Sequence, residues 1–349
     1  MIFAGDIALP FKCTKIDIPE SLCKKGWLVN LEGSIVDEEA AKLLVSKKRV
    51  FNNISALKEL KDQLNIKVCS LANNHIEDCT SVNHTIVKLS KINLPSVGAG
   101  NCLGDAARVL NLQEGGRSIS ILSFGWDVIK CPVATSNKSG VNPYRKEYVI
   151  KTVKKVLASS ENLICFFHWG YELEALPLPY DRELAHILIE LGVNAVIGCH
   201  AHRVQQIEFF KGKPIVYGLG NFLFPHRVFW DGRLKFPEFT RKELAFEITE
   251  EGEFITHWFD YDIDQNRLKF LYSERIEPDM DGFEGKAGYS MLSSKEYDTY
   301  FSNNRFHKKL LPVFKSNESS FSYSAKRSFV IMRRILIDLL VKLNVKAKK

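Results

Sequence analysis

Residues 195–202 read Ala-Val-Ile-Gly-Cys-His-Ala-His, and this stretch decides the fold that we expect. Its apolar start is typical of a buried strand, and the glycine and two histidines close that strand with a loop. Residues two positions apart share a face of a strand, so His200 and His202 are expected to present their rings to one place. Neutral imidazole is the commonest metal ligand in proteins. Taken alone, the stretch fits a metal site and two structural histidines equally well.

Five other segments end a short apolar run with polar side chains that can bind a metal or support its ligands. They are Gly5-Asp6, Asn30-Leu31-Glu32-Gly33, Ala72-Asn73-Asn74-His75 with Asp78 just beyond it, His168-Trp169-Gly170-Tyr171-Glu172 and Gly218-Leu219-Gly220-Asn221. In α/β sheets, sites form beyond the carboxyl ends of strands, and glycines let the backbone approach a ligand closely. Six such strand ends in one chain therefore predict a shared metal site.

Each segment also has a structural explanation when it is taken alone. Asp6 can cap a turn, His75 can cap the helix that follows it, and His168 can pack in an aromatic cluster. Glu172 is expected to orient His168 or a substrate, and Asn221 is expected in a turn where its amide ties two loops together. The joint occurrence of these residues favours a metal site over a set of unrelated structural roles.

The predicted ligands offer oxygen and nitrogen donors without a thiolate. Such a set suits Mn²⁺, Fe, Zn²⁺ or Mg²⁺ better than copper(I) or an iron–sulfur cluster. The candidates outnumber the ligands of one tetrahedral zinc ion, so one or two divalent ions are expected. In a two-metal site the ions lie about 3.5–4 Å apart, and a bridging carboxylate is the natural way to hold them there.

The composition is that of an ordinary globular protein: the chain has 349 residues, 45% hydrophobic and 26% charged. None of the eight cysteines forms a CxxC pair or a zinc-finger spacing, which favours a reducing compartment. The start of the chain lacks the pattern of a secretory signal, and no stretch has the roughly 20 apolar residues of a membrane span. We expect a location in the cytoplasm or peripherally at the inner face of the membrane.

The net charge of +7 comes from the end of the sequence. Residues 326–349 hold eight Lys or Arg and one Asp, so the remaining 325 residues are formally neutral. A neutral body gives no reason to expect a nucleic-acid partner. The apolar and basic tail resembles a helix that lies on a membrane surface. A helix that packs on the domain and keeps its lysines in water is the alternative.

Short apolar runs alternate with helical spacing through roughly the first 200 residues. Strands are expected at residues 2–4, 27–31, 68–72, 119–124, 163–167 and 195–197. Helices are expected at residues 53–65, from residue 82, and at residues 183–191. Two β-hairpins are expected to follow, at residues 205–219 and 244–259. This order predicts an α/β domain with a mixed sheet over residues 1–275, an irregular wrapping segment over 276–325, and a basic apolar helix over 326–349.

The six motifs together resemble the CapA family of capsule or poly-γ-glutamate biosynthesis proteins, a branch of the calcineurin-like metallophosphatase superfamily. The motifs are Gly-Asp, Asn-Leu-Glu-Gly, Leu-Ala-Asn-Asn-His, His-Trp-Gly-x-Glu, Gly-x-His-x-His and Tyr-x-Leu-Gly-Asn-Phe. The resemblance covers roughly residues 1–225. It implies an αββα sandwich of two mixed sheets, with the site at the strand ends.

The resemblance also implies a role for each matching residue. Asp6 resembles the first metal ligand, and Glu32 falls where the superfamily has its bridging aspartate. Asn74 matches the asparagine ligand, and His75 matches the histidine that protonates the leaving group. The remaining histidine ligands correspond to His168, His200 and His202, and a supporting or substrate-binding role falls to Asn30, Asn73, Asp78, Glu172 and Asn221.

Two residues depart from the superfamily pattern. The first superfamily motif is Asp-x-His, but Asp6 is followed by Ile7 and Ala8, so one metal position is short of a ligand. Glu32 replaces an aspartate and has a longer reach. Both departures weaken the expectation of full two-metal phosphatase activity.

The leading hypothesis is a metal-dependent phosphoester hydrolase in capsule or exopolymer biosynthesis, with poly-γ-glutamate or polysaccharide as the polymer. Metal-activated water would attack, Glu32 would bridge the ions, and His75 would act as general acid. A non-catalytic accessory protein that binds an anionic polymer or a lipid-linked intermediate is the second hypothesis. The third is a metal-dependent amide hydrolase or transferase acting on poly-γ-glutamyl chains. The expected partners are therefore an anionic polymer or a phosphorylated small-molecule or lipid-linked substrate.

Overall fold

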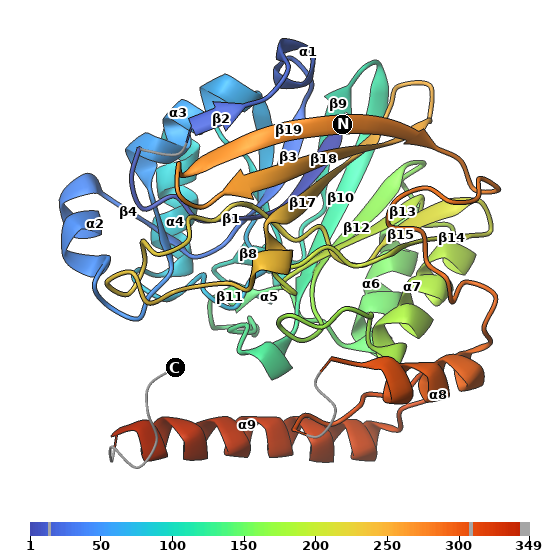
Figure 1. Cartoon of the computed structure of the whole chain (residues 1–349). Coiled ribbons are helices and arrows are strands. Elements are labelled where there is room, and N and C mark those ends of the chain that lie inside the picture. The colour runs from blue at the N-terminus through green and yellow to red at the C-terminus, as the bar shows by residue number, and fades with distance from the viewer. Residues whose placement is uncertain (13–14, 307–309, 343–349) are drawn as a thin grey trace.

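Two mixed β-sheets lie face to face, with helices on their outer sides (Figure 1). The computed structural model describes residues 1–12, 15–306 and 310–342. Within these residues one sheet has nine strands and the other has six. The layer between the sheets is apolar: Phe3 and Leu28 of the first sheet belong to one buried cluster with Phe166 and Ile197 of the second.

In the larger sheet, the strands that carry the predicted site run parallel to one another. The order is β2 (Lys15–Asp17), β19 (Arg267–Ile276), β18 (Phe254–Asp262), β17 (Lys242–Ile248), β1 (Ile2–Ile7), β3 (Trp27–Leu31), β6 (Ile66–Ser70) and β7 (Ser96–Val97), with β16 (Asn221–Leu223) also paired to β1. Strands β1, β3, β6 and β16 are mutually parallel. Their carboxyl ends therefore meet at one edge of the sheet.

The smaller sheet repeats this arrangement. Its order is β14 (Ile207–Phe210), β15 (Lys213–Val216), β13 (Ala195–Cys199), β12 (Leu163–His168), β10 (Arg117–Gly125) and β9 (Leu110–Glu114). Strands β10, β12, β13 and β15 are parallel. Two short ladders lie outside both sheets, β4 (Ser34–Val36) with β5 (Phe51–Asn53) and β8 (Ala99–Gly100) with β11 (Gly140–Val141).

Two helices show why the chain forms helices on the outer faces. Helix α3 (Ile54–Leu64) begins where the Asn53 side chain accepts from the Ser55 amide, and it ends at Asn65, whose φ is 49°. Helix α7 (Pro179–Leu191) begins with a proline and ends at Gly192, whose φ of 113° favours glycine. The apolar sides of α3 and α7 pack on β6 and β13.

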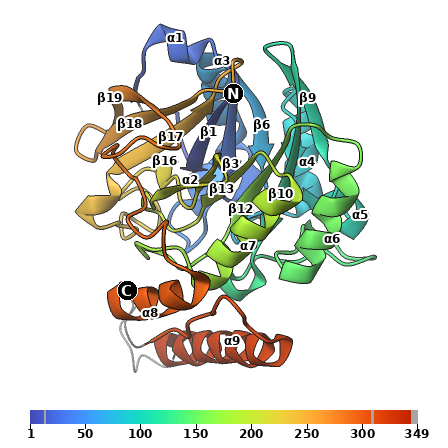
Figure 2. The same ribbon diagram turned by 90° about the vertical axis from the view of Figure 1, so that its right-hand side faces the viewer.

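The other helices are shorter or lie at the periphery. They are α1 (Glu20–Cys23), α2 (Glu38–Leu44), α4 (Val82–Lys91), α5 (Leu103–Ala106), η1 (Asp127–Ile129), α6 (Lys146–Leu157), η2 (Glu238–Thr240), α8 (Ser294–Asn304) and α9 (Ser320–Lys342). Both views place α8 and α9 together on one side of the sandwich, outside the sheets (Figures 1 and 2).

The two-sheet architecture confirms the expected α/β sandwich, and the predicted hairpins are present as β14–β15 and β17–β18. The C-terminal segment differs from the expectation. Helix α8 lies inside the segment predicted to be irregular, because Ser293 and Glu296 form a capping box and Tyr297 and Phe301 bury one side of the helix. Helix α9 begins at Ser320 rather than at residue 326. Residues 343–349 of the predicted helix lie outside the described residues.

Helix α9 is docked on the domain through one side. Tyr323 accepts a 2.7 Å hydrogen bond from the Trp126 indole, and Arg327 donates to Asp127 at 2.6 Å. Val330 is buried beside them. The other side of α9 exposes a row of apolar side chains, which are Phe321, Phe329, Met332, Ile335, Leu336 and Leu339. Among the described residues, no helix combines the length and the apolar content needed to cross the membrane.

Candidate metal centre

The six predicted ligands converge from the ends of strands in both sheets. Asp6 is near the end of β1 and His168 is the last residue of β12, whereas Glu32 follows β3 directly. His200 and His202 follow β13, and Asn74 follows β6. The carboxylates of Asp6 and Glu32 and the imidazoles of His168, His200 and His202 are all buried.

The loop that carries the two histidines has an unusual backbone. His200 has a φ of 95° and His202 has a φ of 52°, both in the left-handed region that few side-chain-bearing residues adopt. Gly198 precedes them, where an added Cβ would lie 2.2 Å from the Tyr217 carbonyl oxygen and 2.3 Å from the Trp169 indole nitrogen. The close approach of these groups therefore requires glycine and fixes where the loop leaves β13.

Asp6 joins the two sheets at the centre. The Asn30 amide donates to Asp6 Oδ1 at 2.7 Å, and the His200 backbone amide donates to Asp6 Oδ2 at 3.2 Å. The His202 Nδ1 atom lies 3.4 Å from Asp6 Oδ2. Burial raises the pKa of Asp6, although His202 and the Asn30 hydrogen bond act in the opposite direction. Asn30 thus contacts a predicted ligand directly, and its supporting role stays a prediction.

Glu32 supplies the strongest sign that the site fits a cation. Both of its carboxylate oxygens are buried, and no described residue donates a hydrogen bond to either of them. The nearest ring nitrogens, His75 Nε2 and His202 Nε2, lie 3.7 and 3.9 Å from Glu32 Oε1. Burial, and next the charge of Asp6, raise the pKa of Glu32 well above its usual range. A buried carboxylate without a partner is unfavourable, and a divalent ion is a partner that these surroundings accept.

His168 and His200 lie close to each other and to Asn74. The His168 Nε2 atom is 2.7 Å from Asn74 Oδ1 and 3.1 Å from His200 Nδ1. Burial lowers the pKa of both histidines well below the ordinary value, and the neighbouring imidazoles lower it further. Both rings are therefore held in the neutral form that binds metals.

The donor atoms fall into overlapping groups that are small enough to hold an ion. Glu32, His168 and His200 offer atoms within 4.8 Å of one another, and so do Asp6, Glu32 and His202. Glu32 belongs to both groups, which is the arrangement that a bridging carboxylate requires. The position of the absent histidine is different: Ala8 is buried there with Val36 and Phe51 in an apolar cluster and offers no donor atom.

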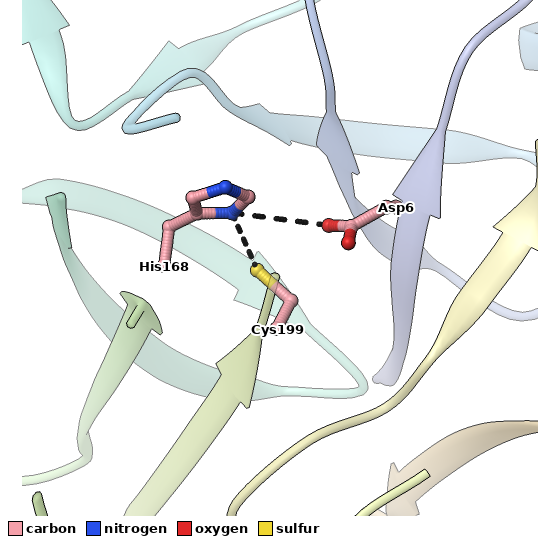
Figure 3. Close-up of side chains that lie close together, drawn as sticks. All are labelled: Asp6, His168 and Cys199. Carbon is pink, nitrogen blue, oxygen red and sulfur yellow. Dashed lines mark hydrogen bonds and ion pairs between the residues drawn. The ribbon is translucent and has the colours of Figure 1, made fainter. Parts of the chain in front are cut away.

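A thiol lies at the centre, and the sequence analysis did not expect one. Cys199 Sγ is 3.2 Å from His168 Nδ1, which is itself 3.9 Å from Asp6 Oδ1 (Figure 3). These three residues form another group with donor atoms within 4.8 Å. In the sequence Cys199 looks like one more apolar strand residue, but it pairs in register with His168 across β12 and β13. Burial raises the pKa of the thiol well above its usual range, so only a bound metal would favour the thiolate.

His75 approaches the centre from its open side. Its side chain is 25% exposed, and its Nδ1 lies 2.8 Å from Asp78 Oδ2. Asp78 also accepts from the Val50 amide at 2.9 Å, which fixes the carboxylate. Because Asp78 holds Nδ1, the other ring nitrogen of His75 is the one that faces Glu32. This orientation suits a proton donor to a group bound at the centre.

The remaining predicted residues support the ligands or lie beside them. Asn221 Oδ1 is 2.9 Å from His202 Nδ1, but Asn221 begins strand β16, paired to β1, and does not lie in the expected turn. Asn73 joins two loops, since it accepts from the Gly33 amide and donates to the Leu31 carbonyl. Glu172 lines the cavity that also contains His200.

A two-sheet α/β sandwich with a buried cluster of carboxylates, imidazoles and an amide at its strand ends defines the metallophosphatase-like class of folds. Residues 26–226 match the model of the family described as bacterial capsule synthesis protein PGA_cap. This chain belongs to that family, which confirms the resemblance seen in its motifs.

Curated relatives agree with this assignment. The PGA biosynthesis protein CapA of Bacillus subtilis is 31% identical over 198 residues, which cover 56% of this chain and 52% of the relative. A probable polyglutamine synthesis accessory protein of Mycobacterium tuberculosis is 31% identical over 209 residues, which cover 56% of this chain and 54% of the relative. The chain thus spans about half the length of the curated relatives it matches.

The solved structures that match this chain are distant from it in sequence. A 5'-nucleotidase precursor from Thermus thermophilus matches with a TM-score of 0.41 and 12% identity, over 79% of this chain and 53% of its own. A putative 5'-nucleotidase from Staphylococcus aureus matches with a TM-score of 0.42 and 12% identity, over 85% of this chain and 56% of its own. These TM-scores are low, and the fold assignment rests on the two sheets themselves.

Proposed function

We propose that this chain is a divalent-metal-dependent phosphoester hydrolase that acts in the assembly of a capsule or a related exopolymer. The observation that carries the proposal is Glu32, a buried carboxylate that has no donor among the described residues and belongs to two groups of candidate ligands. The oxygen and nitrogen donors of Asp6, Asn74 and the three histidines suit Mn²⁺, Fe, Zn²⁺ or Mg²⁺. The polymer class comes from the names of the relatives.

The residues of the chain divide the reaction between them. A divalent ion at such a site supplies charge stabilisation for the phosphoryl group and activation of water. Asp6 and Glu32 provide the negative charge that would hold the ion, and His168 and His200 provide neutral rings. His75 would donate a proton to the leaving group, because Asp78 holds its Nδ1 and leaves its Nε2 directed at the centre.

The test uses the purified chain, metal-free and loaded with Mn²⁺, on model phosphomonoesters and phosphodiesters. His200→Ala should abolish both metal binding and hydrolysis. His75→Ala should leave the metal stoichiometry unchanged and lower kcat by about 10²–10⁴. His84→Ala, on α4, is the control. Metal-replete protein that is inert on both kinds of ester would overturn the proposal.

The second candidate is a non-catalytic accessory protein that binds an anionic polymer or a lipid-linked intermediate. The observation that favours it is Ala8, which leaves the centre without the Asp-x-His histidine. In a polymer-producing host, this candidate predicts that production survives Asp6→Ala and His202→Ala but not deletion of the gene. Equal loss in all three strains would contradict it. Release of glutamyl fragments by the metal-loaded chain would instead identify the amide hydrolase.

A further inference from the structure

A cavity of about 410 Å³ opens beside the metal centre and is lined partly by α9. His200 belongs both to its wall and to the candidate ligands. Helix α9 contributes Val330, Arg333, Arg334 and Ile337. These four positions follow the spacing that places side chains on one face of a helix. A group bound in this cavity would therefore touch both the centre and the C-terminal helix.

The polar part of the cavity wall is strongly cationic. Among the described residues, Lys48, Lys130, Arg333 and Arg334 line it together with a single carboxylate, that of Glu172. These described lining residues carry three positive charges in excess. Lys48 and Lys130 are exposed at the rim, whereas Arg333 and Arg334 are half-buried. The cationic residues and the centre share this wall, because His200 lines the same cavity.

The arginines are held where they are by the docking of α9. Tyr323, Arg327 and Val330 fix the helix one to three turns before the arginines. Arginine presents a planar fork of donors that matches carboxylate and phosphate groups. An excess of positive charge on a positioned helix, next to a metal centre, is what recognition of an anion requires.

We propose that Arg333 and Arg334, with Lys48 and Lys130, form a subsite for a second anionic group of the substrate. The inference rests on the proposed function, since the reacting group would occupy the centre while a neighbouring carboxylate or phosphate occupies the subsite. The substrate class is then a chain that carries anionic groups at successive positions. The arginines lie on α9, outside the residues 26–226 that match the family model.

Binding to the full chain tests the subsite separately from catalysis. Calorimetry would measure tripolyphosphate and a γ-linked pentaglutamate, with and without Mn²⁺. Arg333→Gln with Arg334→Gln should weaken at least one probe by about tenfold or more and leave the Mn²⁺ stoichiometry unchanged. Which probe binds more tightly identifies phosphate or carboxylate as the preferred group. Arg108→Gln with Lys154→Gln removes the same charge from the surface of the domain and should have little effect.

Three outcomes separate the subsite from a general charge effect and from the proposed function. Equal weakening in both double variants, or none in either, would overturn the subsite. Arg333→Lys with Arg334→Lys keeps the charge and should recover part of the binding, which excludes misfolding as the cause. A chain that binds the probes through the arginines but hydrolyses no ester would contradict the proposed hydrolase and still support the subsite.

Discussion

The candidate metal centre and helix α9 lie next to each other, yet the chain builds them differently. The centre is buried in loops held by two sheets, and all its predicted ligands except Asp6 fall within the residues that match the family. Helix α9 lies outside that match, is docked through one side, and exposes the other. The sandwich holds the candidate ligands, whereas α9 carries the two arginines that we propose bind a second anionic group of the substrate.

The comparison depends first on the centre being independent of α9. Glu32→Gln removes the carboxylate shared by two ligand groups and should weaken Mn²⁺ binding by about a thousandfold. At 100 times the wild-type Kd, the metal should stabilise the wild type by about 2.7 kcal/mol and the variant hardly at all. Thermal unfolding with and without Mn²⁺ measures this. Glu38→Gln, on the exposed start of α2, is the control. A full metal-induced shift in Glu32→Gln would show that Glu32 is not a ligand.

The reverse change should loosen α9 and spare the centre. Tyr323→Ala removes a buried ring that packs on Phe314 and Tyr180, together with the hydroxyl that accepts from the Trp126 indole. The free energy of unfolding should fall by about 3 kcal/mol, while Mn²⁺ binding to the folded protein stays unchanged. Tyr323→Phe keeps the ring and should lose only about 1 kcal/mol. Loss of metal binding in Tyr323→Ala would show that the centre depends on α9.

The buried carboxyl of Asp181 should make the stability of the fold depend on pH. Asp181 follows Tyr180, whose ring packs on Tyr323 of α9. Burial raises the pKa of Asp181 to about 7 from the ordinary value of 3.8, and its Oδ1 accepts from the Tyr144 hydroxyl. The folded chain holds this proton more tightly than the unfolded chain, so the stabilisation is full below about pH 4 and is lost as the pH rises to about 7.

Asp181→Asn cannot titrate and should therefore flatten this dependence. The difference in unfolding free energy between pH 5 and pH 8 should shrink by about 2 kcal/mol. Denaturant unfolding at both pH values provides the measurement. Asp62→Asn, at an exposed position, should change nothing. An Asp181→Asn profile that overlays the wild type would show that this carboxyl stays ionised in the fold.

The smallest effect on stability is expected on the exposed side of α9. Met332→Ser with Leu336→Ser should change the unfolding free energy by no more than about 0.5 kcal/mol each. The apolar row and the basic residues after it predict attachment to an anionic membrane surface, where each Lys or Arg contributes roughly 1 kcal/mol. Flotation with anionic and neutral vesicles tests this. Equal partitioning of the wild type and the double variant would leave α9 without a membrane role.

The sequence predicted much of the fold because the ends of helices and strands depend on residues close together in the chain. Asn53 caps the start of α3 through its own side chain, and Gly192 ends α7 through its left-handed backbone. Both signals depend on the residue itself and not on distant contacts. Asp6 and His200 were predictable as partners because the carboxyl ends of parallel strands meet at one edge. Their separation of 194 residues is bridged by topology alone.

The remainder depended on contacts that no local pattern contains. Cys199 reaches His168 only through the register of β13 against β12. The cationic cavity gathers Lys48, Lys130 and Arg334 from three distant parts of the chain. Each of these residues looks like an ordinary surface charge in the sequence, and only the packing of the fold brings them to one cavity.

The left-handed backbone at His200 and His202 makes these two positions unfavourable for histidine. Each such residue stores about 1–3 kcal/mol of strain, and glycine would relieve most of it. His200→Gly and His200→Ala both remove a buried ring, so both should lose stability through the cavity that they leave. Only His200→Gly also relieves the backbone strain, so it should unfold at a higher temperature than His200→Ala, by the equivalent of about 1–3 kcal/mol. The backbone at this position thus favours glycine, and the histidine there is explained by its place in the centre rather than by stability. Equal melting temperatures of the two variants would refute this view.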